Sequence, residues 1–227
     1  MKFTDQNDAG SKLLEILPRN ELKANNFLIL CLNIKSVIMC DFVARGLDLG
    51  YEILFSEDIK TPNNDECDIA CVSESEDVVI NEALRVSFEI TKDYIYGRAK
   101  KLYEEKILKN VYKYRKGGLL SPLKDRNILL ITDSCETGAR LAVATKSLTN
   151  MGAKSVILGI ALMPSDMAEY ANTIVDDVYC AFKIDGFVST DFYYEKTLDN
   201  DENAILKILE DSPYYLPLKK QGVSNAN

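Results

Sequence analysis

Apolar and polar positions along this chain follow two alternating patterns. Continuous apolar runs, typical of strands buried on both faces of a sheet, occur at 26–32, 51–55, 127–131, 155–162 and 178–182. Apolar residues recur at helical spacing between and around them, over 13–17, 37–47, 91–113, 137–151, 165–171 and 201–209. This order predicts right-handed βαβ units. The fold class is therefore α/β, an open and mostly parallel sheet with helices on both faces.

Residues 60–82 depart from this alternation. Two short apolar runs, 69–72 and 78–80, are separated by the polar segment S-E-S-E-D, and turn residues flank both runs. Short runs bounded in this way favour a hairpin with a solvent-exposed tip over a helix. We therefore expect a small hairpin beside the main sheet.

Composition limits the classes of protein to consider. The 227 residues contain no linker, so we expect one domain over 1–227, with a disordered tail at about 218–227. The net charge of −8 argues against nucleic acid as the main partner, and a short basic segment at 109–116 fits a solvated helix end. No apolar signal region or membrane span is visible, so a cytoplasmic protein without a membrane partner is expected.

The chain contains no histidine, which narrows the available chemistry. Histidine triads, histidine metal sites and imidazole bases are excluded, and carboxylates, Lys, Tyr, thiols and bound ions remain. The six cysteines are scattered, which suits reduced core thiols. Cys67 and Cys71 have ligand spacing but lack a second pair, so no resident metal is predicted.

The segment 127–140, N-I-L-L-I-T-D-S-C-E-T-G-A-R, carries the main candidate chemistry. An apolar strand ends at Asp133, and a polar loop with Gly138 leads into a helix, an order that places backbone N–H groups and a helix N-terminus at the sheet edge. Thr137 and Arg140 suit phosphate oxygens, and Gly138 permits close backbone approach. A tight strand-to-helix turn, with Asp133 as a cap and Arg140 paired on the surface, fits the same residues.

This segment resembles the phosphoribosyl-pyrophosphate loop of the type I phosphoribosyltransferases, in which acidic residues after a strand precede T-G-x-T. Asp133, Thr137 and Gly138 match that signature, and Ala139 is compatible with it. One bacterial subgroup resembles the chain over roughly residues 3–209. Its further motifs are matched in order by Phe3, Asp5, Asp8, Ala9, Gly10, Pro62, Asn64, Glu66, Val79 to Glu82, Tyr193, Glu195, Asp201 and Glu202.

The resemblance implies a type I phosphoribosyltransferase-like fold with a small hood drawn from about 1–20 and 180–212. It implies transfer of a phosphoribosyl group from phosphoribosyl pyrophosphate, with Mg²⁺, to a nitrogenous base with release of pyrophosphate. Asp133 would contact the ribose hydroxyls as the catalytic residue. The hood would select the base, and a homodimer is a reasonable expectation from the family. The other implied substrate-binding residues are Lys35, Ser36, Ser134, Cys135, Glu136, Thr137, Gly138, Ala139 and Arg140.

The chain departs from the family pattern at several charged positions. Thr132 replaces the first acid of the usual pair, and Glu136 places a carboxylate beside the expected phosphate. In the pyrophosphate loop only Lys35 keeps a positive charge, while Glu57 and Asp58 align with a basic pair. These changes predict weak or lost activity, and a catalytically lapsed regulatory protein that binds a nucleotide or ribose phosphate is the alternative. A thiol enzyme using Cys135 is a third hypothesis.

Overall fold

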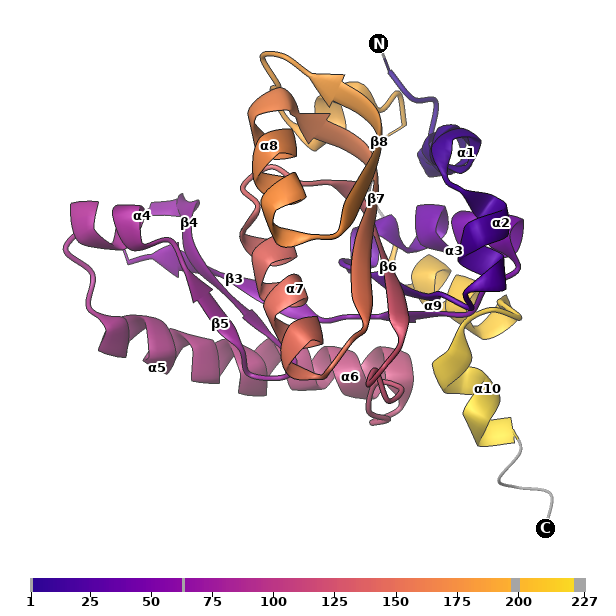
Figure 1. Cartoon of the computed structure of the whole chain (residues 1–227). Helices are drawn as coiled ribbons and strands as arrows, with labels where there is room; N and C mark the ends of the chain where they lie inside the picture. Colours follow the sequence, from indigo (N-terminus) through magenta and orange to yellow (C-terminus); the bar gives the residue numbers. More distant parts are fainter. Residues whose placement is uncertain (1, 63, 197–200, 223–227) are drawn as a thin grey trace.

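The computed structural model describes residues 2–62, 64–196 and 201–222. Five strands form a parallel sheet in the order β2-β1-β6-β7-β8, of which β6, β7 and β8 are labelled in Figure 1. The sheet confirms the predicted fold class and each strand expected in it. The strands are β1 (Leu28–Cys31), β2 (Tyr51–Ile53), β6 (Asn127–Ser134), β7 (Ser155–Pro164) and β8 (Asp177–Ile184).

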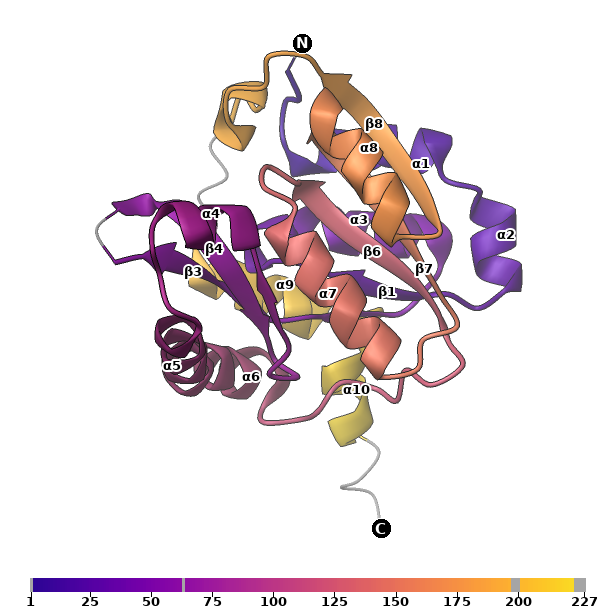
Figure 2. The ribbon, with the colours of Figure 1, turned by 60° about the vertical axis from the view of Figure 1, so that its left-hand side comes forward.

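Helices cover both faces of this sheet, as predicted (Figure 2). Alternate residues of each strand point to opposite faces, so Ile29 and Leu129 belong to one apolar core while Leu28 and Leu130 belong to the other. Two cores explain why apolar residues occupy neighbouring positions of these strands and do not alternate with polar ones. The first face carries α1 (Gln6–Ile16), α3 (Val37–Leu47) and α9 (Glu202–Asp211), and the second carries α7 (Ala139–Asn150) and α8 (Ser165–Ile174).

A separate antiparallel sheet of three strands stands beside the main sheet (Figure 1). The predicted hairpin is confirmed by the pairing of Ala70 with Ile80 and of Val72 with Val78. A further strand on its other edge places residues 56–61 opposite β4. Helix α7 packs against all three strands and joins the two sheets. The strands are β3 (Ser56–Thr61), β4 (Asn64–Ser73) and β5 (Val78–Ile80).

The predicted helix over 91–113 is a long helix with a π turn within it. It consists of α5 (Lys92–Leu102), the π segment η2 (Tyr103–Ile107) and α6 (Leu108–Arg115). The buried positions on either side repeat at intervals of three and four, but the interval from Leu102 to the next buried one, Ile107, is five. The extra residue in the π turn keeps the apolar stripe on one face. Without it, Lys106 would face the core.

Short elements that the apolar pattern did not predict complete the structure. They are α2 (Arg19–Ala24), α4 (Glu82–Ser87), the 3₁₀ turns η1 (Ile34–Ser36) and η3 (Thr190–Tyr193), and α10 (Leu216–Gly222).

Helix α10 continues to residue 222 and so covers the first part of the segment expected as a tail. Two contacts hold the start of this helix. Tyr215 is fully buried against Tyr51, and Leu216 lies over Gly50. Residues 223–227 lie outside the described part. Within the described residues, no helix has the length and apolar character needed to cross a membrane.

Candidate functional site

A cavity of about 580 Å³ opens at the carboxyl ends of β1 and β6, where parallel sheets of this type bind ligands. It is bounded by the loop after each of these strands, by β3 and by residues 189–191. Eight of the ten predicted site residues line it. They are Lys35, Asp133, Ser134, Cys135, Glu136, Thr137, Gly138 and Arg140, whereas Ser36 and Ala139 do not line it.

The loop between β6 and α7 has the conformation that the glycine predicted. Gly138 adopts a φ of 72° and forms the N-cap of α7. A Cβ at this position would lie 2.5 Å from Met167 Cε and 2.9 Å from Tyr170 Cε1, so both the backbone angle and the packing require glycine. The first turn of α7 therefore begins at the cavity with its backbone N–H groups directed toward the loop.

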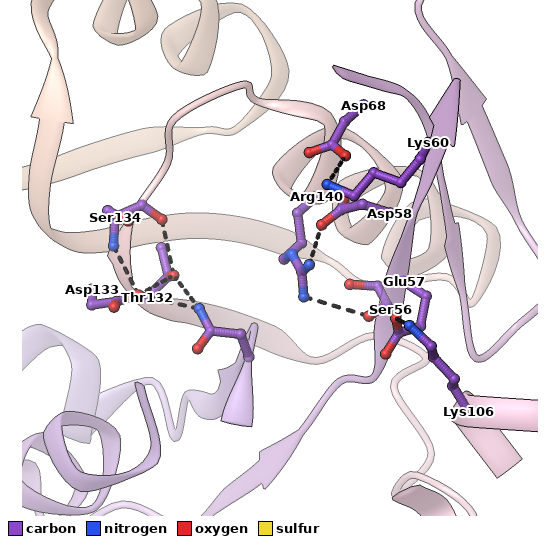
Figure 3. Close-up of polar contacts among 11 residues, drawn as sticks. Ser56, Glu57, Asp58, Lys60, Asp68, Lys106, Thr132, Asp133, Ser134 and Arg140 are labelled. Atoms are coloured by element: carbon purple, nitrogen blue, oxygen red, sulfur yellow. Dashed lines mark hydrogen bonds and ion pairs between the residues drawn. The ribbon is translucent and has the colours of Figure 1, made fainter. Parts of the chain in front are cut away.

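Asp133 is buried in the cavity wall and is held by several donors. Its Oδ1 accepts hydrogen bonds from Ser36 Oγ at 2.6 Å, Asn33 Nδ2 at 3.1 Å and the Ser134 backbone N–H at 3.0 Å. Asp133 does not cap α7, since no side chain caps that helix. The carboxylate instead ties the end of β6 to the turn after β1, close to Thr132 and Ser134 (Figure 3).

The turn after β1 is a rigid 3₁₀ turn. Asn33 Oδ1 accepts hydrogen bonds from the backbone N–H and the hydroxyl of Ser36, and Gln6 Nε2 donates to the carbonyl of Lys35. Ser36 is fully buried, so its hydroxyl positions Asp133 and does not reach the cavity. The sequence placed Ser36 among substrate-binding residues because neighbouring positions in a loop cannot be sorted by burial before the fold is known.

Glu136 and Arg140 turn away from the centre of the loop in different directions. Glu136 Oε1 accepts hydrogen bonds from the backbone N–H of Thr190 at 3.0 Å and from its hydroxyl at 2.6 Å. Arg140 reaches across the cavity to the carboxylate of Asp58 and to the Ser56 carbonyl at 3.4 Å (Figure 3). Glu136 is therefore drawn toward 189–191, which lessens the repulsion expected between it and a bound phosphate.

The carboxylates of β3 line the cavity, as the family comparison of charges predicted, but each has a cationic partner. Asp58 pairs with Arg140, and Glu57 pairs with Lys106 Nζ at 3.2 Å. Lys106 belongs to the π segment, and sequence reasoning missed it. The sequence gives no signal for it, because Tyr103 continues the apolar pattern between Leu102 and Ile107 and only burial reveals the longer interval. The negative charges of Glu57 and Asp58 are thus offset by these two cations.

Sequence reasoning also missed the residues that β4, α6 and the segment after β8 bring to the cavity. The side chains are polar and lie far apart in the chain, so no motif connects them. They are Asp68, Asn110, Ser189, Thr190 and Asp191.

The thiol of Cys135 is poorly suited to nucleophilic chemistry. Burial raises its pKa to about 11, and the hydrogen bond with the Gly138 backbone only partly opposes this. At neutral pH the group is almost entirely protonated, whereas the thiolate is the nucleophile. The thiol-enzyme hypothesis therefore loses its basis. No group of three or more acidic or cysteine side chains in the described residues could hold a metal ion by itself.

Three adjacent aromatic residues at 192–194 follow β8, and two of them pack into the core. Tyr193 and Tyr194 are buried, and their rings contact Phe187 and Phe3 respectively. Phe192 is half exposed and carries Lys2 over its ring. The N-terminus and residues 190–196 are joined by this packing and by the pairing of Phe3 with Tyr194. Selection of a base by these segments stays a prediction.

Comparison with known proteins places the chain among distant relatives. No family model matches it. The chain is 24% identical to proteins from two strains of Mycobacterium tuberculosis, each named "Putative phosphoribosyl transferase". The match extends over 182 residues, which is 78% of this chain but only 40% of the length of those proteins. The crystal structure of TT1426 from Thermus thermophilus has a TM-score of 0.73 and 22% identity, covering 93% of this chain and 99% of that one. The resemblance to the phosphoribosyltransferases is confirmed by these similarities in sequence, and the solved structure shows the same fold.

Proposed function

We propose that this protein transfers the phosphoribosyl group of phosphoribosyl pyrophosphate to a nitrogenous base. The observation that carries the proposal is the loop at 135–138. It joins the carboxyl end of a parallel strand to the N-terminus of α7, and Thr137 and Gly138 line the cavity there. A helix N-terminus with accessible N–H groups binds phosphate well. The 5-phosphate of the donor fits this position.

Asp133, in the cavity wall beside the phosphate loop, would bind the ribose hydroxyls of the donor. Its Oδ1 is fixed by Ser36 and Asn33, so the carboxylate is held in one orientation before any ligand arrives. A fixed negative charge next to the ribose would stabilise the oxocarbenium-like transition state of displacement at C1. Thr132 contributes a hydroxyl where the family has a second acid, which leaves Asp133 as the one carboxylate in this pair of positions.

In the proposed reaction, a nitrogen of the base bonds to C1 of the ribose as the bond from C1 to the pyrophosphate oxygen breaks. Pyrophosphate leaves with the bonding electron pair, and the nitrogen releases its proton to water. Mg²⁺ bound with the donor would neutralise charge on the leaving pyrophosphate. The side chains are compatible with an ion coordinated mostly by the donor's own oxygens, because Glu57 and Asp58 are already paired with cations.

Calorimetry with phosphoribosyl pyrophosphate and Mg²⁺ tests the proposal. We expect binding that both Asp133→Asn and Gly138→Leu weaken by roughly tenfold or more, since each removes part of the preformed site. A screen of nitrogenous bases for pyrophosphate release then identifies the acceptor. Absence of donor binding, together with binding of a nucleoside monophosphate, would contradict the enzyme and support a regulatory nucleotide-binding protein.

Lys35 provides a narrower test of the donor site. It lines the cavity beside the 3₁₀ turn, at the position that the resemblance assigns to pyrophosphate. Lys35→Ala should abolish pyrophosphate release in the base screen while leaving the fold intact, because the contact with Gln6 that holds the turn uses the backbone carbonyl of Lys35. An unchanged rate would remove Lys35 from the proposed mechanism.

A further inference from the structure

A second cavity of about 550 Å³ continues the first one past the 3₁₀ turn. Ile34, Lys35, Glu57 and Asn110 line both, so the two cavities adjoin each other. The phosphate loop at 135–138 lines only the first cavity. The π segment and α6 line only the second cavity, except for Asn110 of α6, which lines both. A ligand with its phosphate on the loop that extends past Lys35 would therefore enter the second cavity.

The π turn decides which side chains the long helix presents to this space. It moves Ile107 into the buried stripe and leaves Lys106, Lys109 and Asn110 on the cavity side. Lys106 and Lys109 are three residues apart and so lie on neighbouring positions of one helix face. These two lysines and Asn110 line the same cavity as Lys35.

The charges around this space are arranged so that its acids are already partnered. Glu105 pairs with Lys101 at 3.8 Å, Glu202 pairs with Lys113, and Glu57 pairs with Lys106. Lys101 and Lys113 lie outside the lining of the second cavity. Among the ion pairs of the described residues Lys109 does not take part, and its ammonium group is exposed. Glu105 and Glu202 are thus paired with lysines outside the cavity, whereas Glu57 competes with an incoming anion for Lys106.

We propose that Lys106, Lys109 and Asn110, together with Lys35, form the subsite that holds the pyrophosphate of the donor. This inference rests on the proposed function and deepens it. Glu57 and Asp58 stand at the positions after the second strand where the family has cations. In this chain Lys106 of the π segment and Lys109 of α6 would supply the positive charge instead. A pyrophosphate oxygen takes over Lys106 from Glu57, and the amide of Asn110 donates to an oxygen between the two cavities.

The test uses inorganic pyrophosphate and ribose 5-phosphate as separate calorimetric probes of the full chain. The double variant Lys106→Ala, Lys109→Ala should weaken pyrophosphate binding by roughly tenfold or more, because two charge-assisted contacts are lost. Its affinity for ribose 5-phosphate should change by less than about twofold, since that ligand needs only the loop. The double variant Lys100→Ala, Lys154→Ala removes two exposed lysines that lie outside both cavities, and it is the control for net charge.

The outcomes separate the subsite from the proposed function. Unaltered pyrophosphate binding by the variant at Lys106 and Lys109, or equal weakening by the control variant at Lys100 and Lys154, overturns the subsite. Ribose 5-phosphate binding would then still support the transferase. Pyrophosphate binding that depends on the two lysines, without ribose 5-phosphate binding, supports the subsite and contradicts the transferase. Glu57→Gln should tighten pyrophosphate binding by roughly threefold, because Lys106 no longer has to leave a carboxylate. Weaker binding by this variant would overturn the proposal that pyrophosphate replaces Glu57 as the partner of Lys106.

Discussion

The two walls of the cavity are built by different interactions. On the wall made by the main sheet, Asp133, Ser36 and Asn33 form a buried hydrogen-bond network, and Gly138 fixes the loop beside it. On the opposite wall, β3 and the helices meet through ion pairs that are partly exposed, such as that between Glu57 and Lys106. The first wall is preorganised, whereas the second consists of contacts that an anion can exchange.

The difference follows from burial. A buried carboxylate must be satisfied by fixed donors, so removal of one partner leaves others unpaired and costs stability. A partly exposed ion pair is screened by water and contributes little to stability, so it can open when a ligand offers a better partner. We therefore expect substitutions on the first wall to affect folding and binding together, and substitutions on the second wall to affect binding alone.

Asp133→Ala should give the largest effect. It leaves Ser36, Asn33 and the Ser134 N–H without their shared acceptor, and we expect a loss of about 3 kcal/mol in the free energy of unfolding. Urea unfolding followed by circular dichroism measures this. Asp191→Ala is the control, since Asp191 also lines the cavity but is exposed, and its effect should stay within about 0.5 kcal/mol. An equal loss in the free energy of unfolding by the two variants would show that the buried hydrogen-bond network of Asp133 stabilises the protein no more than an exposed side chain does.

Gly138→Ala should destabilise the protein by about 2 to 3 kcal/mol, through an unfavourable positive φ and contact with Met167 and Tyr170. Gly186→Ala provides a matched comparison. Gly186 has a φ of 64° with open space around its Cβ position, so only the backbone term of about 1 kcal/mol remains. Thermal unfolding of both variants isolates the packing contribution at the loop. If the two variants lose the same stability, close packing does not fix the loop.

Asp58→Asn tests the exchangeable wall. Removing the acid frees Arg140 for a phosphate, and the affinity for phosphoribosyl pyrophosphate should rise by about 1 kcal/mol, roughly fivefold. The free energy of unfolding should change by less than about 1 kcal/mol, because the pair is partly exposed. Calorimetry at two salt concentrations measures the gain, which should shrink at high salt. A loss of affinity would show that Asp58 itself contacts the ligand or its metal ion.

Cys135→Ala should have the smallest effect on binding, below about twofold in affinity, because the thiol does not act as a nucleophile in the proposed reaction. In the native protein, alkylation of Cys135 by iodoacetamide should be slow at pH 7 and rise toward pH 11, since burial raises the pKa of this thiol to about 11. Mass spectrometry of the modified peptide follows the rate. Rapid alkylation at neutral pH would restore the thiol-enzyme hypothesis.

Local patterns predicted much of the fold because they reflect local physics. Continuous apolar runs identified all five strands of the main sheet, and the short runs around S-E-S-E-D identified the β4–β5 hairpin. Residues of the family motifs near the chain ends proved to be helix caps, since Asp5 accepts hydrogen bonds at the start of α1 and Asp201 does so at the start of α9. β3 and α10 were missed because neighbouring segments, not their own periodicity, stabilise them.

The sequence by itself determined the sheet, the position of Asp133 at its edge and the glycine of the loop, because each depends on residues close together in the chain. Only the tertiary structure decided the charge balance of the cavity. Ion pairs such as that between Arg140 and Asp58 join residues that are 82 positions apart, and the π turn directs Lys106 to the cavity. The interaction of two charges depends on the distance between them in space, so the effect of a charged side chain on a site is set by the neighbours it has in the folded protein.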